Sequence, residues 1–189
     1  MQNIYEVELR YKLDGEGCHA KALEETLVYL GFTHSKSIRQ EDIYYSSKHK
    51  DFIESEECLR IRTVDGLSEI TWKPPSCADM KVADEFWKEE VDLQIKSQHD
   101  VAKRLLTALD FFEVAIVEKQ RTSYEGPNGV EVSLDLVSSV GTFVEIEVKH
   151  SDANQGKEII RQIAVEIGVS NYEICRTPYR DLVRNLKNA

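Results

Sequence analysis

Residues 4–13 read IYEVELRYKL, and this stretch alternates strictly between apolar and charged side chains. Successive side chains of a β-strand point to opposite faces, so one face would be apolar. The other face would carry two carboxylates and two cations: Glu6, Glu8, Arg10 and Lys12. Residues 142–149, TFVEIEVK, repeat this pattern with Glu145, Glu147 and Lys149 in alternation. Two strands with such faces predict a surface that binds a charged ligand.

Length and composition place the chain among soluble globular proteins. Its 189 residues suit one domain, or two small halves that share a core, and we predict a single domain over residues 1–189. The formal net charge of −10 argues against a nucleic acid or an anionic membrane as the partner. A local cluster of arginines and lysines can still bind a small anion. Scattered cysteines, and no apolar run of membrane-spanning length, predict a cytoplasmic protein.

The order of elements predicts an α+β fold. Hairpin-linked strands are expected at 4–13, 32–47, 58–64, 68–73, 84–94, 111–124, 130–137 and 142–149. Asp65-Gly66 predicts a tight turn between the third and fourth of these. Helices are expected over 18–30, from Ser97 onward with Val101, Leu105, Leu106 and Leu109 as the apolar stripe, and over 153–167. Thr177 and Pro178 predict a short C-terminal helix.

Charged faces recur on several of these strands, which suggests that they converge. For a single strand, a solvated face with weak cross-strand ion pairs is the simpler interpretation. The repetition favours inward-pointing charge, which requires a closed antiparallel eight-stranded β-barrel or tunnel with a polar lumen and helices packed outside. Carboxylates hold hard divalent cations, and arginine and lysine hold phosphate oxygens. The combination is what a metal–polyphosphate complex requires.

Charged residues recur in short motifs along the chain, and the first of these is Glu6-Val7-Glu8-Leu9-Arg10. Further motifs follow in the order Gln40-x-Asp42-x-Tyr44-Tyr45, Leu59-Arg60-Ile61-Arg62, Thr71-Trp72-Lys73-Pro74-Pro75, Glu118-Lys119-x-Arg121, Leu134-Asp135 and Gly141-x-Phe143-x-Glu145-Ile146-Glu147. In this order they resemble the motifs of the CYTH superfamily, the triphosphate tunnel metalloenzymes, and the first is similar to the family's opening ExExK signature, with arginine in the third position. They span nearly the whole chain and resemble most closely the class IV adenylate cyclase branch.

The resemblance implies roles for individual residues. The metal ligands, for Mg²⁺ or Mn²⁺, would be Glu6, Glu8, Asp135, Glu145 and Glu147. The triphosphate would be bound by Arg10, Arg60, Arg62, Lys73, Lys88, Lys119, Arg121 and Arg180. The residues implied to be catalytic are Glu6, Glu8, Arg10, Lys119 and Arg121.

Three functions are compatible with this pattern. The first is an adenylate cyclase that converts ATP to cyclic AMP and pyrophosphate. The second is a triphosphatase acting on tripolyphosphate, thiamine triphosphate or a nucleotide, which the Arg60-x-Arg62 pair also suits. The third is a non-catalytic binder of polyphosphate or nucleotide, which the retained carboxylates disfavour. A nucleotide or polyphosphate is therefore the expected partner, and a sheet of this kind leaves room for a homodimer.

Overall fold

The computed structural model describes residues 5–13, 18–75 and 90–188. The fold is α+β, and its nine described strands form a sheet in the order β5-β4-β3-β2-β6-β7-β8-β1-β9. Every strand pair with a defined register is antiparallel, as predicted. The order ends at β5 and β9, so among the described residues the sheet is not closed and the predicted barrel is not confirmed.

The chain divides into two compact units. The first contains Met1–Ile38 and Gln120–Thr177, and the second contains Arg39–Lys119 and Pro178–Ala189. The long strands β2 (Thr33–Ser47) and β6 (Phe111–Glu125) each contribute residues to both units. The single domain over residues 1–189 stays a prediction.

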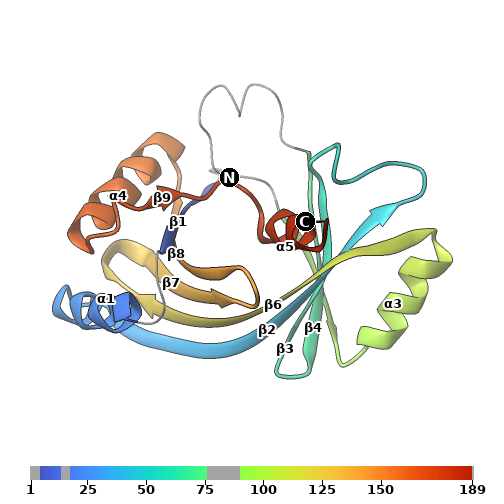
Figure 1. Cartoon of the computed structure of the whole chain (residues 1–189), viewed down its shortest axis with the longest axis horizontal. Helices are drawn as coiled ribbons and strands as arrows, with labels where there is room; N and C mark the ends of the chain where they lie inside the picture. The colour runs from blue at the N-terminus through green and yellow to red at the C-terminus, as the bar shows by residue number, and fades with distance from the viewer. Residues whose placement is uncertain (1–4, 14–17, 76–89, 189) are drawn as a thin grey trace. The chain divides into compact units, whose positions relative to one another are not determined.

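In the first unit, β1 (Tyr5–Leu13) pairs with β8 (Gly141–His150), which pairs with β7 (Val130–Val137). The alternation of β1 is confirmed, because Val7, Leu9 and Tyr11 are buried. Helix α4 (Ala153–Glu166) lies alongside β1 and β8 (Figure 1). The helix approaches closely at Gly156, where an added Cβ would lie 2.9 Å from a methyl carbon of Val7. The helix therefore covers the apolar face of β1 and leaves its charged side chains on the opposite face.

Local chemistry explains where the helices of the first unit begin and end. Helix α1 (Cys18–Tyr29) is followed by Gly31, whose φ of +86° is the left-handed conformation that terminates helices. Helix α4 begins after Asp152, whose carboxylate accepts from two backbone amides of the first turn. The predicted turn after β6 is the 3-10 helix Pro127–Gly129. The two-residue strand β9 (Glu173–Ile174), which pairs with β1, was not predicted.

In the second unit, β3 (Cys58–Val64) and β4 (Leu67–Lys73) form the predicted hairpin. Asp65 and Gly66 both have positive φ, as a two-residue hairpin turn requires. Strand β5 (Val91–Lys96) pairs with β4, and helix α3 (His99–Ala108) follows it. The core gathers residues of β2, β3 and α3, together with Phe52 of the turn between β2 and β3: Ile43, Tyr45, Phe52, Leu59, Ile61, Ala102 and Leu106. Helix α5 (Tyr179–Asn188) is the predicted C-terminal helix.

Three predictions for the second unit need correction. The strand expected over 84–94 begins outside the described residues, and its described part extends to Lys96. Ser97 does not cap the next helix, because Gln98 holds the N-cap position and makes no side-chain capping bond. Of the predicted apolar stripe only Leu106 is buried, beside Ala102, which was not predicted. The other three members, Val101, Leu105 and Leu109, are exposed. The sheet beneath α3 selects the face that is buried, and periodicity alone cannot.

No helix in the described ranges is long and apolar enough to cross a membrane.

Candidate functional site

The register of the first unit builds a row of carboxylates. Glu8 of β1 lies opposite Glu147 of β8, and Glu147 lies opposite Glu131 of β7. Glu6 lies one step along the same face, with a carboxylate oxygen 3.6 Å from Nζ of Lys149. Glu131 was not among the predicted ligands. The alternation of residues 130–137 already placed its side chain on the charged face, but only the pairing of β7 with β8 brings it beside Glu147.

Glu147 is the carboxyl group most affected by this crowding. Burial raises its pKa, and the charges of Glu6, Glu145, Glu8 and Glu131 raise it further, to about 7. The four charged neighbours that cause the shift are all carboxylates, so an added cation would relieve their repulsion.

A second group in the first unit consists of alternating arginines and carboxylates. Arg121 donates to Asp135 through Nε at 2.7 Å and Nη2 at 2.6 Å, and Nη2 also donates to Glu145 at 2.7 Å. Arg10 donates to the other oxygen of Glu145, through Nε at 3.2 Å and Nη2 at 3.0 Å. Asp135 is completely buried, and Glu145 is nearly so. Burial works against the charged form of Arg121, but the two carboxylates outweigh it and raise its pKa.

These contacts separate the residues predicted as metal ligands into two sets. Oxygens of Asp135 and Glu145 accept hydrogen bonds from arginine, whereas Glu6, Glu8 and Glu147 share the carboxylate row with Glu131. Over the described residues, no three histidine, cysteine, aspartate or glutamate side chains are already gathered at metal-binding spacing. The chemistry of the row nevertheless fits a hard divalent cation, because its donors are carboxylate oxygens with an excess of negative charge.

The second unit gathers cations around one buried carboxylate. Asp42 of β2 lies opposite Arg62 of β3 and accepts from its Nε at 2.7 Å and its Nη2 at 2.8 Å. Nη1 of Arg60 lies 3.7 Å from the same carboxylate. Burial tends to raise the pKa of Asp42, but the charges of Arg62, Arg60 and Lys119 and hydrogen bonds from Arg62 hold it well below its usual range. Asp42 is therefore ionised at neutral pH.

Arg60 has hydrogen-bonding capacity that the described protein does not use. Its Nη2 donates to Glu90 at 3.2 Å, while its Nε is buried without a partner among the described residues. The other oxygen of Glu90 lies 3.2 Å from Nζ of Lys73, so one carboxylate bridges two predicted phosphate ligands. A buried guanidinium nitrogen without an acceptor is costly, and a phosphate oxygen would satisfy it.

Two further predicted phosphate ligands of the second unit, Lys119 and Arg180, lie at α5. Nζ of buried Lys119 lies 5.1 Å from the ring centre of Tyr179. Arg180 donates to the backbone oxygen of Glu57 at 2.8 Å and to both carboxylate oxygens of Asp181 at 3.0 and 3.1 Å. The guanidinium of Arg180 therefore has protein partners that anchor α5.

The sequence-predicted residues thus fall into one group in each unit. The first unit holds Glu6, Glu8, Arg10, Arg121, Asp135, Glu145 and Glu147. The second unit holds Arg60, Arg62, Lys73, Lys119 and Arg180. Lys88 lies outside the described residues. Sequence reasoning assigned no role to Glu131, Asp42 or Glu90, although Asp42 belongs to a motif that it singled out.

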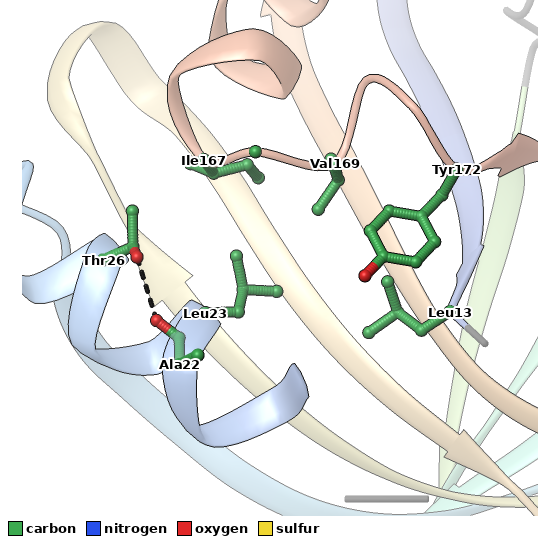
Figure 2. A pocket seen from close by; sticks show the side chains of 8 residues that line it. Leu13, Ala22, Leu23, Thr26, Ile167, Val169 and Tyr172 are labelled. Atoms are coloured by element: carbon green, nitrogen blue, oxygen red, sulfur yellow. Dashed lines mark hydrogen bonds between the residues drawn. The ribbon is translucent and has the colours of Figure 1, made fainter. Parts of the chain in front are cut away.

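A pocket elsewhere in the first unit has a different character. It has a volume of about 140 Å³ and is lined by side chains of α1, the end of β1 and the segment after α4 (Figure 2). Leu13, Leu23, Ile167 and Val169 supply apolar side chains, and Thr26 and Tyr172 supply hydroxyl groups, so the wall is mixed in polarity. None of the predicted site residues lines this pocket. It is separate from the charged groups.

Comparison with known proteins identifies the family of the chain. The pattern of the CYTH domain matches residues 5–174. A protein of Methanocaldococcus jannaschii named "putative adenylate cyclase" is 32% identical over 182 residues, which cover 95% of this chain and 98% of that protein. Two solved proteins of Pyrococcus horikoshii share the fold. One is 25% identical with a TM-score of 0.78, covering 94% of this chain and 99% of its own. The other is 27% identical with a TM-score of 0.77, covering 98% of this chain and 100% of its own. The chain belongs to the CYTH family.

Proposed function

We propose that this protein is a metal-dependent enzyme that acts on a triphosphate, and that its reaction is the conversion of ATP to cyclic AMP and pyrophosphate. The observation that carries the proposal is the carboxylate row of the first unit, whose oxygen donors suit a divalent cation. Within the second unit, and independently, a partly buried group of arginines and lysines supports the binding of an anion. The unsatisfied Nε of Arg60 supports the binding of an anion. The cyclase assignment is supported by the M. jannaschii relative and its name.

The carboxylate row supplies the residues that would hold Mg²⁺ or Mn²⁺, namely Glu6, Glu8 and Glu147, with Glu131 beside them. A bound divalent ion supplies charge that activates the attacking hydroxyl and stabilises the departing pyrophosphate. Asp135 and Glu145 are proposed as further ligands only if their hydrogen bonds with arginine break. These bonds join Asp135 to Arg121, and Glu145 to Arg121 and Arg10.

The cations bind and orient the substrate in this proposal. Arg60, Arg62, Lys73 and Lys119 would neutralise the phosphate oxygens, with Arg10 and Arg121 as additional donors. Because phosphoryl transfer needs little covalent help from the protein, positioning and charge stabilisation would supply most of the acceleration. The oxygen of the ribose 3′-hydroxyl would attack the α-phosphorus and close the ring as the bond to pyrophosphate breaks, and the hydroxyl proton would pass to solvent.

A triphosphatase is the second candidate, and the Arg60-x-Arg62 pair favours it. Two guanidiniums on one strand suit a compact polyphosphate without a nucleoside. In that reaction water would attack the terminal phosphorus of the substrate and release that phosphorus as orthophosphate.

Products separate the two candidates. Purified protein is incubated with ATP or with tripolyphosphate in the presence of Mn²⁺ or Mg²⁺, and the products are resolved by chromatography. Cyclic AMP with pyrophosphate supports the cyclase. ADP with orthophosphate, or turnover of tripolyphosphate alone, overturns it in favour of the triphosphatase.

The metal ligands are tested separately. Glu6→Gln and Glu8→Gln are expected to abolish metal-dependent turnover and to leave the circular dichroism spectrum unchanged. Activity that survives both changes contradicts the metal assignment.

A further inference from the structure

Asp42 is the buried carboxylate on which the charges of Arg60, Arg62 and Lys119 act. Its side chain is 2% exposed, and each oxygen accepts from a different nitrogen of Arg62. The hydroxyl of Tyr44 lies 3.4 Å from one of these oxygens. With both oxygens engaged in this way, Asp42 has little capacity to contact a substrate or a metal directly.

The negative charge of Asp42 attracts more than one cation. Arg60 and Arg62 alternate on β3 and therefore lie on the same face of the strand, where their like charges repel. Nη1 of Arg60 lies 3.7 Å from Asp42, and Arg62 is bonded to it directly. Lys119 also lies close enough for its charge to act on the Asp42 carboxyl. A single buried negative charge thus offsets the repulsion among three groups.

The hydrogen bonds also fix geometry. A bidentate arginine–carboxylate pair holds the guanidinium in one plane, because two parallel N–H···O bonds must be satisfied together. The buried amide of Gln40 lies against the same guanidinium. Arg62 is therefore held rigidly, and Arg60, with its unused Nε, has its charge partly balanced without losing that donor.

We propose that Asp42 is a positioning residue that sets the orientation of Arg62 and the spacing of Arg62 from Arg60, and so tunes the affinity for polyphosphate. The inference rests on the proposed function, because it assumes that these arginines bind the substrate. The first unit contains a similar bidentate pair, in which Arg121 donates two parallel hydrogen bonds to buried Asp135.

Asp42→Asn tests the inference, because it keeps the size of the side chain and removes its charge. The dissociation constant for tripolyphosphate is measured by calorimetry without metal, alongside KM and kcat with Mn²⁺. Loss of the supporting charge is expected to weaken tripolyphosphate binding on the order of tenfold, with a larger effect on KM than on kcat. The matched control is Asp110→Asn, since Asp110 is a carboxylate of the same unit, paired with Lys48 away from the arginines.

A double-mutant cycle distinguishes positioning from a general loss of structure. If Asp42 acts through Arg62, adding Asp42→Asn to Arg62→Lys should weaken binding much less than it does in the wild type. A merely structural aspartate would lower the unfolding temperature equally in both backgrounds and leave the binding constant of the folded protein unchanged. If Asp42→Asn does not fold, Asp42→Glu keeps the charge and shifts the carboxylate by one methylene. Weaker binding by a folded Asp42→Glu then supports positioning.

The outcomes separate the inference from the function on which it rests. Wild-type protein that binds tripolyphosphate, together with an Asp42→Asn variant of equal affinity, overturns the positioning role and leaves the proposed function intact. Wild-type protein that neither binds nor turns over a triphosphate overturns both. Unchanged binding by Asp42→Glu, where it is the variant that folds, also counts against the inference.

Discussion

The guanidinium of Arg121 is bonded to the carboxylate of Asp135 through two parallel hydrogen bonds, Nε to Oδ1 at 2.7 Å and Nη2 to Oδ2 at 2.6 Å. Asp135 is fully buried, so its charge depends on this partner for compensation. Arg121 in turn links Asp135 to Glu145, and Glu145 to Arg10. The pair is thus part of a connected network, and changing one member leaves the others buried with unbalanced charge.

Replacing the aspartate of this pair is expected to destabilise the first unit. Asp135→Asn removes the charge that balances Arg121, and breaking a buried ion pair typically costs about 3–5 kcal/mol. The free energy of unfolding, measured by urea denaturation, should fall by that order. A decrease indistinguishable from that of Asp110→Asn, which alters an exposed ion pair, would contradict the assignment of Asp135 to the buried network.

Glu147 makes the stability of the metal-free protein depend on pH. Its folded-state pKa of about 7 exceeds its ordinary value of 4.5, so the folded state holds the proton more tightly than the unfolded state does. Its contribution to stability is full below about pH 4.5 and is lost as pH rises through about 7.

The measurement is thermal or urea unfolding with a chelator between pH 4.5 and 8. Glu147→Gln should lose less stability over this range than the wild type, by about 1–3 kcal/mol. Identical slopes for the two proteins would show that Glu147 does not titrate there. Added Mn²⁺ should stabilise the wild type more at pH 8 than at pH 5, because protons and metal compete for the same carboxylates.

Glu131 is expected to strengthen metal binding because it lies opposite Glu147 in the register. Glu131→Gln removes one negative charge from the row, and the Mn²⁺ concentration for half-maximal activity should rise by about tenfold. Glu125→Gln is the control, since Glu125 is an exposed carboxylate of the same unit bonded to Ser35. If the Mn²⁺ concentration for half-maximal activity rises equally in both variants, the cause is the change in net charge and not the position of Glu131 in the carboxylate row.

Glu90 is expected to compete with the substrate. Its carboxylate bridges Arg60 and Lys73 at 3.2 Å each, as a phosphate group would. Glu90→Gln removes this internal anion, so KM for the triphosphate should fall by a few fold, consistent with an ion pair that is partly exposed. Glu113→Gln, which alters an ion pair with Lys103 in the same unit, should leave KM unchanged. A higher KM in Glu90→Gln would instead show that Glu90 supports the cations.

Adjacent leucines of α3 test which face of the helix is buried. Leu106 is 7% exposed and Leu105 is 56% exposed. Leu106→Ala should lower the free energy of unfolding by about 2–4 kcal/mol, because it opens a cavity in the core. Leu105→Ala should change it by about 0.5 kcal/mol or less, as surface substitutions usually do. Equal losses would indicate that α3 packs as its periodicity alone predicts.

Much of the local structure follows from the sequence because it depends on neighbours along the chain. The alternation of residues 4–13 gives β1 with its apolar face buried, and Asp65-Gly66 gives the hairpin turn. The predicted helices over 18–30 and 153–167 agree with α1 and α4 to within one residue at either end. The error in α3 has a specific cause: leucines lie on adjoining stripes, and the choice between them depends on the sheet against which the helix packs.

By itself, the sequence determined the alternating strands, the types of charged residue and their placement on one face of each strand, because side-chain alternation is a local property of the backbone. The family followed from motifs along the chain and is confirmed by the match over residues 5–174. Only the tertiary structure decided which charges meet. The register of the strands places Glu131 opposite Glu147 and Asp42 opposite Arg62. In the folded protein Arg121 also donates hydrogen bonds to both Asp135 and Glu145. Register depends on pairing between distant segments, so spacing along one strand cannot specify it.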